Sequence, residues 1–409
     1  MSVITKIQAR EILDSRGNPT IEATVFTENS SAMASVPSGA STGSHEAWEL
    51  RDGDKRFLGK GVKKAIKNIE KKIAPLLSGV DCTRQREIDT LMIEKDGTEN
   101  KAKLGANAIL AVSLACAKAA ANEQGKYLYE YINELPQVGM EMKMPRPFMN
   151  IINGGKHADN KLSFQEFMIV PKGKNFSENI EIASEIYHKL QKELEKKFGK
   201  GSTNVGDEGG FAPLKLNKAT QALDILMKTI RDLGYVRKCD LAIDAAASEF
   251  YKGGKYQVDG KKMSKEQLLN YYLSLLKKYP LISIEDPFQQ NDFESFAKLK
   301  QKAGTQIVGD DLTVTNQERI TAAIREDSCN CLLLKVNQIG TLTEALDAAK
   351  LARENGWQVM VSHRSGETED TFIADLAVGL GCGQLKAGAP CRGERTAKYN
   401  QLLRIEEVI

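Results

Sequence analysis

The feature that most constrains this chain is a repeat of short apolar segments, each ending on a charged or ionisable residue. In the C-terminal half these segments end at Glu285, Asp310, Lys335, His363 and Lys386, spaced 25, 25, 28 and 23 residues apart. Each spacing fits one strand followed by one helix. Continuously apolar strands joined by amphipathic helices indicate parallel strands covered on both faces. In a β/α barrel the ends of such strands carry the chemistry, so we expect these side chains at one mouth.

The same pattern predicts where the barrel begins. The stretch PQVGMEMKMPRP at 136–147 breaks a helical pattern and predicts two domains, residues 1–136 and 137–409. Strands are expected at 148–152 and 164–170 with no helix between them, then helices near 177–198 and 217–233. Counting from 148 gives eight strands in the order ββαα(βα)6. The predicted fold class is α/β, a C-terminal eight-stranded β/α barrel preceded by a smaller α+β domain.

The smaller domain is predicted from a change of periodicity. Apolar and polar residues alternate before residue 35, as at Ile21, Ala23 and Val25, which is typical of a sheet with one wet face. After residue 61 the apolar spacing becomes helical, and an alanine-rich helix is expected at 104–121. Between them lies the loop VPSGASTG at 36–43, which contains Ser41. Its small residues suit a mobile loop that closes on a ligand.

Two local signals predict helix starts inside the barrel. Thr341 and Glu344 match the capping box, in which each side chain bonds the backbone of the other residue. Acidic residues from Glu367 to Asp370 predict a helix that begins after Gly366. In that position Gly366 would let the backbone approach an anion.

Composition argues against several classes of function. The chain has 57 basic and 54 acidic residues, a net charge of +3, which gives no reason to expect nucleic-acid binding. No apolar run approaches the ~20 residues of a membrane span, and the start, MSVITKIQAR, lacks the apolar core of a signal peptide. The seven cysteines are scattered and odd in number, as in proteins with reduced thiols. We therefore expect a cytoplasmic protein.

Three acids at successive strand ends predict a metal site. Asp244, Glu285 and Asp310 close the third to fifth predicted strands. A set of carboxylates without His or Cys suits Mg²⁺ or Mn²⁺ rather than zinc. The alternative is that each acid forms a separate ion pair or helix cap.

The next strand end carries a candidate base. Lys335 is expected to lie near the metal charge and near Lys386, which would lower its pKa and allow it to take a proton. Sites of this kind combine a lysine base with one or two Mg²⁺ ions that stabilise an ene-diolate. The alternative is a lysine paired with one of the acids.

Other candidates lie in loops. His363, Arg364 and Ser365 follow the seventh predicted strand, where barrels bind phosphate, and the arginine fork suits that anion; a structural arginine that caps carbonyl groups is the alternative. His157 and Glu208 lie in glycine-rich loops. His157 could close over a ligand and Glu208 could act as a general acid, or both could be solvated loop residues.

Motifs along essentially the whole chain resemble the enolase family. They run from REILDSRGNPT at 10–20 to KYNQLLRIEE at 398–407 and include VPSGASTG at 36–43, NGGKHA at 153–158, QEFM at 165–168, NVGDEGGFAP at 204–213, SIEDPF at 283–288, GDDLTVTN at 309–316, LLLKVNQIGT at 332–341, SHRSGETEDT at 362–371 and KAGAPCRGER at 386–395. The chain differs from the family pattern by a trimmed 199–203 region and by Phe372 in place of a smaller residue.

The resemblance implies a lyase, phosphopyruvate hydratase, which dehydrates 2-phospho-D-glycerate reversibly to phosphoenolpyruvate in glycolysis and gluconeogenesis. In the family pattern two Mg²⁺ ions bind per site, the second arriving with substrate. Asp244, Glu285 and Asp310 match the ligands of the first, and Ser41 matches a ligand of the second.

The resemblance also implies roles for the remaining site residues. Lys335 matches the base that takes the C2 proton, and Glu208 matches the acid that helps the C3 hydroxyl leave through an ene-diolate intermediate; His157 and Glu166 match further catalytic groups. The substrate contacts implied are His157, Glu166, Glu285, Asp310, Lys335, His363, Arg364, Ser365 and Lys386.

Partners and alternatives complete the predictions. The implied partners are the small-molecule substrate and further copies of the chain in a homodimer or higher oligomer, with secondary display and plasminogen binding at a cell surface as a second role. The runner-up enzyme uses the same barrel to racemise or dehydrate unphosphorylated acids, against which the HRSG loop and the Ser41 loop argue. A purely non-catalytic binding protein would show a damaged site, whereas every position here is filled.

Overall fold

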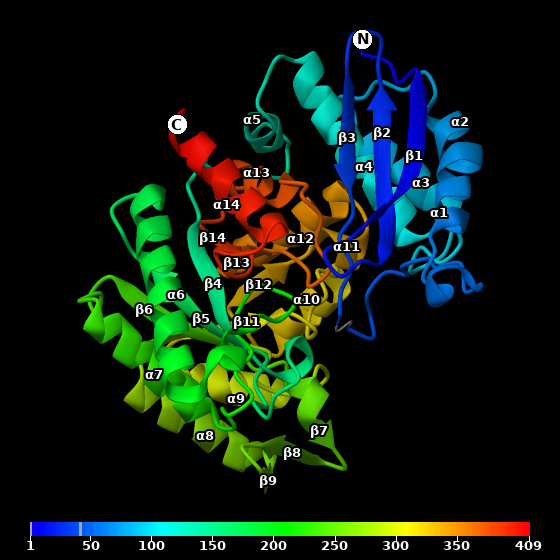
Figure 1. Ribbon diagram of the computed structural model, residues 1–409. Helices are drawn as coiled ribbons and strands as arrows, with labels where there is room; N and C mark the ends of the chain where they lie inside the picture. Colours follow the sequence, from blue (N-terminus) through cyan, green and yellow to red (C-terminus); the bar gives the residue numbers. More distant parts are fainter. Residues whose placement is uncertain (1, 41–42) are drawn as a thin grey trace.

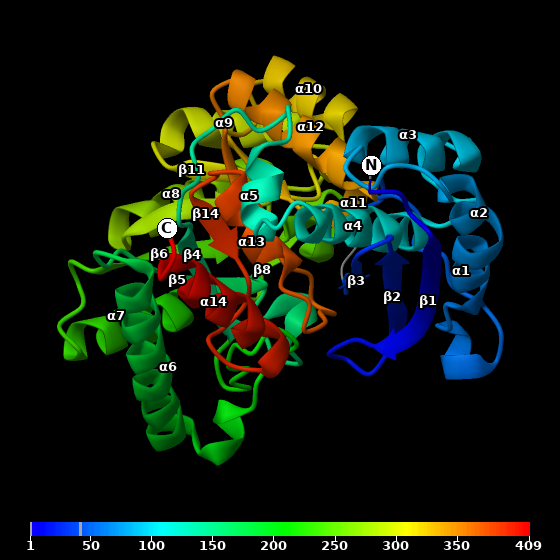
Figure 2. The same cartoon turned by 90° about the horizontal axis from the view of Figure 1, so that it is seen from above.

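A small α+β domain lies beside a closed barrel (Figure 1). The computed structural model describes residues 2–40 and 43–409, so the predicted metal ligand Ser41 lies outside the described residues. Seen from above, the N-terminal sheet and helices flank one side of the barrel (Figure 2). Among the described residues, no helix combines the length and the apolar character needed to cross a membrane.

The small domain pairs a three-stranded antiparallel sheet with a layer of helices. Ile21, Ala23 and Val25 of β2 are buried, as their alternation predicted, and α4 packs on β2 and β3. The elements are β1 (Lys6–Leu13), β2 (Pro19–Phe26), β3 (Ser31–Ser35), α1 (Lys63–Asn68), a π-helical segment (Ile69–Ile73), α2 (Ala74–Leu77), α3 (Gln85–Asp96), α4 (Ala106–Glu123) and α5 (Leu128–Asn133).

Eight strands close the barrel, and the predicted order ββαα(βα)6 is confirmed. β5 runs antiparallel to both of its neighbours, β4 and β6, while the other strand pairs are parallel. Around the barrel the strands are β4 (Arg146–Asn153), β5 (Glu166–Pro171), β6 (Cys239–Asp244), β10 (Leu281–Glu285), β11 (Gln306–Gly309), β12 (Cys331–Leu334), β13 (Gln358–Ser362) and β14 (Gln384–Lys386).

Helices cover the outside of the barrel (Figure 1). Two of them join β5 to β6, and a short sheet of β7 (Tyr251–Lys252), β8 (Lys255–Val258) and β9 (Lys261–Met263) follows β6. The helices are α6 (Phe176–Phe198), α7 (Ala219–Asp232), α8 (Lys265–Lys278), α9 (Phe293–Ala303), α10 (Gln317–Arg325), α11 (Val336–Ile339), α12 (Leu342–Glu354), α13 (Phe372–Gly379) and α14 (Gly393–Glu406).

Strand register brings three acids to one level of the barrel. Asp244, the last residue of β6, lies opposite Glu166 of β5 and opposite Glu285 of β10. Glu166 begins its strand rather than ending it, and it reaches the same mouth because β5 is antiparallel. Below this level the interior is filled by apolar side chains, including Phe148, Met168, Val308, Leu333 and Met360. This apolar layer separates the acids at the mouth from polar residues at the opposite end, such as Gln306 and Gln384.

The helix predicted after Gly366 begins later than expected. α13 starts at Phe372. Glu367 is buried and forms hydrogen bonds with other segments, so it does not belong to the first helical turn. Its carboxylate accepts hydrogen bonds from the backbone N–H of Arg364 at 3.1 Å and from Lys398 Nζ at 2.9 Å. A Cβ at Gly366 would lie 2.5 Å from Arg16 Nη2. Gly366 thus permits packing against the small domain.

The capping box predicted at Thr341 is only half formed. The Thr341 hydroxyl accepts from the backbone N–H of Glu344 at 3.1 Å and caps α12. The Glu344 carboxylate instead accepts from the Thr341 hydroxyl at 2.6 Å and pairs with Lys101 Nζ at 2.9 Å. Lys101 of the small domain therefore pairs with the Glu344 carboxylate, which in a complete capping box would accept from the backbone N–H of Thr341.

A largely buried ion pair also joins the two parts of the chain. Lys118 of α4 donates to both carboxylate oxygens of Asp370 at 2.7 and 2.8 Å, and Asp370 also accepts from the backbone N–H of Ser35. Burial raises the pKa of Asp370, but Lys118 and the hydrogen bonds outweigh it and the pKa is lowered.

Lys118→Met is expected to lower the free energy of unfolding by about 3 kcal/mol, because it leaves a buried carboxylate unpaired. Since the folded pKa of Asp370 lies below its unfolded value of about 3.9, this contribution is present above that pH and is lost as the pH falls through the folded pKa. Urea denaturation at several pH values measures both effects. The double variant Lys118→Met/Asp370→Asn should recover part of the loss; equal stability of Lys118→Met and wild type contradicts the prediction.

Candidate active site

The predicted site residues within the described part of the chain converge on the C-terminal mouth of the barrel. Strands β5, β6, β10, β13 and β14 and the segments after them bring most of these side chains together, although His157 and Lys386 are 229 positions apart in sequence. A small cavity there is lined by His157, Gln165, Glu166, Glu208, Asp244, Lys335, Ser362, His363, Arg364, Ser365 and Lys386.

Lys386 is the centre of the carboxylate cluster. Its Nζ lies 2.7 and 2.8 Å from the two carboxylate oxygens of Glu285, and 3.2 Å from an oxygen of Asp244 and of Glu166. All four side chains are buried. Burial lowers the pKa of Lys386, but the surrounding carboxylates outweigh it and hold the pKa well above its usual value. Lys386 is therefore a fixed positive charge.

Lys335 forms a second lysine–carboxylate pair beside the first. Its Nζ lies 2.5 Å from Asp310 Oδ2, and the other oxygen of Asp310 accepts from Gln338 Nε2 at 2.9 Å. Burial lowers the pKa of Lys335, but attraction to Asp310 outweighs it, so the pKa of Lys335 is raised in the polypeptide alone. The sequence predicted a lowered pKa for Lys335 beside bound metal, and that direction stays a prediction because the raised pKa is that of the polypeptide without metal.

The three predicted metal ligands reach the same mouth but do not form one tight group. Among the described residues, two groups have ligand atoms that all lie within 4.8 Å of one another, and neither is this trio. Asp244 and Glu285 are bridged by Lys386, while Asp310 is turned toward Lys335. The ammonium groups thus lie against the oxygens that the sequence assigns to a cation.

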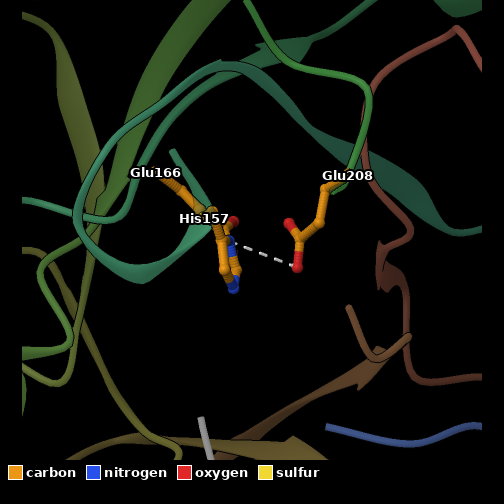
Figure 3. Close-up of side chains that lie close together, drawn as sticks. All are labelled: His157, Glu166 and Glu208. Carbon is orange, nitrogen blue, oxygen red and sulfur yellow. Dashed lines mark ion pairs between the residues drawn. The ribbon is translucent and has the colours of Figure 1, made fainter. Parts of the chain in front are cut away.

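One of the tight groups consists of His157, Glu166 and Glu208 (Figure 3). His157 Nδ1 lies 3.4 Å from Glu208 Oε1 and 3.6 Å from Glu166 Oε1, and its Nε2 lies 3.1 Å from the Ser365 hydroxyl. His157 and Glu208 are both buried, at 4% and 3% exposure. The alternative that they are solvated loop residues is therefore wrong.

His363 faces Glu208 from the other side. Its Nε2 lies 3.4 Å from Glu208 Oε2, which also accepts from Asn150 Nδ2 at 3.0 Å. Burial is the main reason that the pKa of His363 falls to about 4. At neutral pH the ring is uncharged, and its Nε2 lies beside Glu208 without a regular hydrogen bond among the described residues.

The two glutamates near His157 have opposite pKa shifts. Burial and the negative charge of Glu208 raise the pKa of Glu166 well above its usual value. Burial also raises the pKa of Glu208, but His157, His363 and Arg395 outweigh it, so the pKa of Glu208 is lowered. In the polypeptide alone, Glu166 therefore holds a proton more tightly than Glu208 does. The acid role of Glu208 stays a prediction.

Arg364 is held at the rim of the mouth by the small domain. Its two terminal nitrogens lie 3.0 and 3.1 Å from the two carboxylate oxygens of Glu46, and Nη1 donates to Asn337 Oδ1 at 2.9 Å. The alternative of an arginine that caps carbonyls does not describe these contacts. Arginine forms bidentate pairs with carboxylate and with phosphate alike, so Glu46 occupies the contact that the sequence assigns to phosphate.

Several polar residues of the site were not assigned from the sequence. Asp286 and Asp311 form the second tight group with Asp310, and the Asp286 carboxylate accepts from the backbone N–H groups of Asp310 and Asp311. Burial and the charge of Asp310 raise the pKa of Asp311 to about 8. Both acids directly follow a predicted ligand, a signal that was available. Gln338 lies one helical turn after Lys335, but Glu46 and Arg395 have no local signal.

Comparison with known proteins agrees with this geometry. A family model described as the enolase C-terminal TIM barrel domain matches residues 141–409, and one described as the enolase N-terminal domain matches residues 4–132. A curated protein from Methanocaldococcus jannaschii, named enolase, is 58% identical over 406 residues, which cover 99% of this chain and 95% of that protein. The chain therefore belongs to the enolase family, and its enzyme class is that of a lyase, phosphopyruvate hydratase.

Proposed function

We propose that this lyase catalyses the Mg²⁺-dependent, reversible dehydration of 2-phospho-D-glycerate to phosphoenolpyruvate, a step of glycolysis and gluconeogenesis. The observation that carries the proposal is the pair of buried lysines, Lys335 and Lys386, set among carboxylates at one barrel mouth with Arg364 at its rim. A phosphorylated hydroxy acid needs such positive groups on both its carboxylate and its phosphate.

The buried charges support a divalent cation. Four carboxylates share two ammonium groups at the mouth, namely those of Glu166, Asp244, Glu285 and Asp310 with those of Lys335 and Lys386. Burial and this excess of negative charge raise the pKa of Glu285. Because the donors are hard oxygens and two positive charges are lacking, Mg²⁺ fits the set. When bound by Asp244, Glu285 and Asp310, it would supply positive charge where proton removal builds negative charge.

The chain's own residues divide the reaction between two sides of the cavity. Lys335 takes the C2 proton, and Lys386 remains charged and attracts the substrate carboxylate. Glu208, on the loop at 204–213, assists loss of the C3 hydroxyl, with His157, Glu166 and His363 beside it. Arg364 and Ser365 bind the phosphate. The cavity is lined by buried side chains, so closure over substrate excludes water.

A coupled assay tests the proposed activity. The purified chain with Mg²⁺ is expected to convert 2-phosphoglycerate to phosphoenolpyruvate and to leave the unphosphorylated analogue, glycerate, unchanged. Arg364→Met should raise the KM for 2-phosphoglycerate, because it removes the fork that is proposed to bind the phosphate. Turnover of unphosphorylated acids at a similar rate would favour the racemase or dehydratase alternative, and no turnover of either would favour a binding protein.

The organisation of the chain is also part of the proposal. We propose domains at 1–136 and 137–409, supported by family models that end at 132 and begin at 141. A homodimer or higher oligomer, cytoplasmic localisation and a secondary plasminogen-binding role at the cell surface stay predictions. Sedimentation of the purified chain measures its oligomeric state.

Closure of the two loops over substrate predicts protection from protease. Subtilisin is expected to cut the free protein near 38–43 or 154–160, where Lys156 and Asp159 are exposed, and to cut these sites more slowly when 2-phosphoglycerate and Mg²⁺ are present. The hairpin at Gly253 and Gly254 of the β7–β9 sheet is a control, because its residues are not among those that line the cavity. Equal rates with and without ligands at both loops contradict closure.

A further inference from the structure

Arg395 of α14 is a fully buried arginine whose two terminal nitrogens contact two segments of the active site, residues 363–365 and Asp207. Nη1 lies 2.6 Å from His363 Nδ1 and donates to the carbonyl oxygen of Arg364 at 2.6 Å. Nη2 donates to the carbonyl oxygens of Ser365 at 2.5 Å and of Asp207 at 3.1 Å. One side chain therefore holds the histidine, the loop with the phosphate-binding residues, and the residue before Glu208.

The contact with His363 determines which ring nitrogen carries the proton. A guanidinium group has donors only and stays charged in proteins. His363 Nδ1, at 2.6 Å from one of these donors, must therefore present its lone pair. The proton of the neutral ring is then on Nε2, the nitrogen that lies 3.4 Å from Glu208 Oε2. The other tautomer would place two N–H groups against each other.

The aliphatic part of the Arg395 side chain is also tightly packed. A Cβ added at Gly388 would lie 2.9 Å from Arg395 Cδ and 2.8 Å from the carbonyl oxygen of Glu208. That same carbonyl accepts from the backbone N–H of Ala389 at 2.9 Å. The Arg395 stem and the Glu208 backbone thus rest against one glycine, so a shift of Arg395 changes the position of Glu208 as well.

We propose that Arg395 is a positioning residue of this lyase, which holds His363 in the Nε2–H tautomer and ties the loop of Glu208 to the loop of Arg364 and Ser365. The catalytic consequence rests on the proposed function, in which Glu208 assists loss of the hydroxyl. None of the hydrogen bonds of Arg395 described above involves Lys335 or Lys386. Arg395 should therefore affect hydroxyl loss and leave removal of the C2 proton intact.

The tautomer can be measured without any assay of activity. The chain has four histidines, so nitrogen NMR of the protein with ring-labelled histidine is tractable, and His363→Gln assigns the signals of His363. We expect wild-type His363 to show an unprotonated Nδ1 and a protonated Nε2 at neutral pH. A proton on Nδ1 of His363 in the wild type overturns the proposal, whichever reaction the protein catalyses.

Rate measurements on a variant of Arg395 then distinguish a positioning role from a general effect on stability. Arg395→Lys keeps the charge and loses the fork, so formation of phosphoenolpyruvate should fall by roughly 10- to 100-fold, the loss seen when an outer partner of a functional histidine is removed. Exchange of the C2 hydrogen with deuterated water should stay close to the wild-type rate. Equal losses in both rates, or no loss in either, overturn the proposal.

Arg353→Lys is the matched control. Arg353 also donates to three backbone carbonyls, those of Gln137, Val138 and Leu380, but it lies in a pocket with Gln358 at the other end of strand β13. Arg353→Lys should leave both rates unchanged. If the wild type forms no phosphoenolpyruvate, the proposed function fails, and the NMR experiment still decides whether Arg395 sets the tautomer.

Discussion

Lys335→Ala is expected to abolish both exchange of the C2 hydrogen with solvent and formation of phosphoenolpyruvate. Lys335 directly follows strand β12 and lines the cavity, where Nζ is held 2.5 Å from Asp310. Because every later step depends on removal of the C2 proton, loss of the base should lower both rates by roughly 10⁴-fold, the upper part of the range for proton transfer. NMR of 2-phosphoglycerate in deuterated buffer with Mg²⁺ measures the two rates together.

Glu208→Gln is expected to affect mainly one of these two rates, which distinguishes it from Lys335→Ala. It keeps the shape of the side chain and its place beside His157 and His363, but it removes the acid. Formation of product should fall by roughly 10²–10⁴-fold while some exchange at C2 persists. If Lys335→Ala exchanges the C2 hydrogen at the wild-type rate, Lys335 is not the base, and Lys386 or His363 must be considered.

Removal of metal is expected to have the second large effect, complete loss of activity that Mg²⁺ restores. The expectation follows from buried carboxylates that outnumber the ammonium groups beside them. Asp244→Asn removes one charged ligand from the set, so it should raise the Mg²⁺ concentration needed for half-maximal activity. Metal analysis of the chelated protein and Mg²⁺ titrations of both proteins measure these effects.

Asp240→Asn is the matched control for this titration. Asp240 lies on the same strand as Asp244, toward the opposite end of the barrel, and pairs with Arg146 and Lys172. The control should leave the Mg²⁺ requirement unchanged. Full activity of a chelated protein with negligible metal content would contradict the metal requirement. The carboxylates would then only pair with the lysines.

The periodicity of the chain was enough to predict the barrel and the ends of its strands. Apolar segments spaced by one strand and one helix leave few ways to bury both faces of a sheet. The missing helix between β4 and β5 predicted an unusual start of the barrel, and in the structure β5 is antiparallel to its neighbours. For the same reason Glu285, Lys335 and Lys386 could be placed at one mouth before any coordinates were known, because strand direction alone sets which end they occupy.

Contacts between distant segments could not be predicted in this way. His157 and Glu208 come from glycine-rich loops whose sequence is equally suited to solvent, and packing against Ser365 and His363 makes them buried. The pKa of Lys335 rises because Asp310 turns toward it, a choice of side-chain rotamer that periodicity does not encode.

The clearest contrast is between strand-end residues and their long-range partners. Glu46 is 318 positions from Arg364, and Arg395 is 32 positions from His363, with no pattern in the chain to connect either pair. Local spacing determines which residues share a strand end or a helix face, since it follows from backbone geometry. The partners of buried charges depend instead on how whole domains pack. Each buried donor needs an acceptor nearby, and that acceptor can come from any part of the chain.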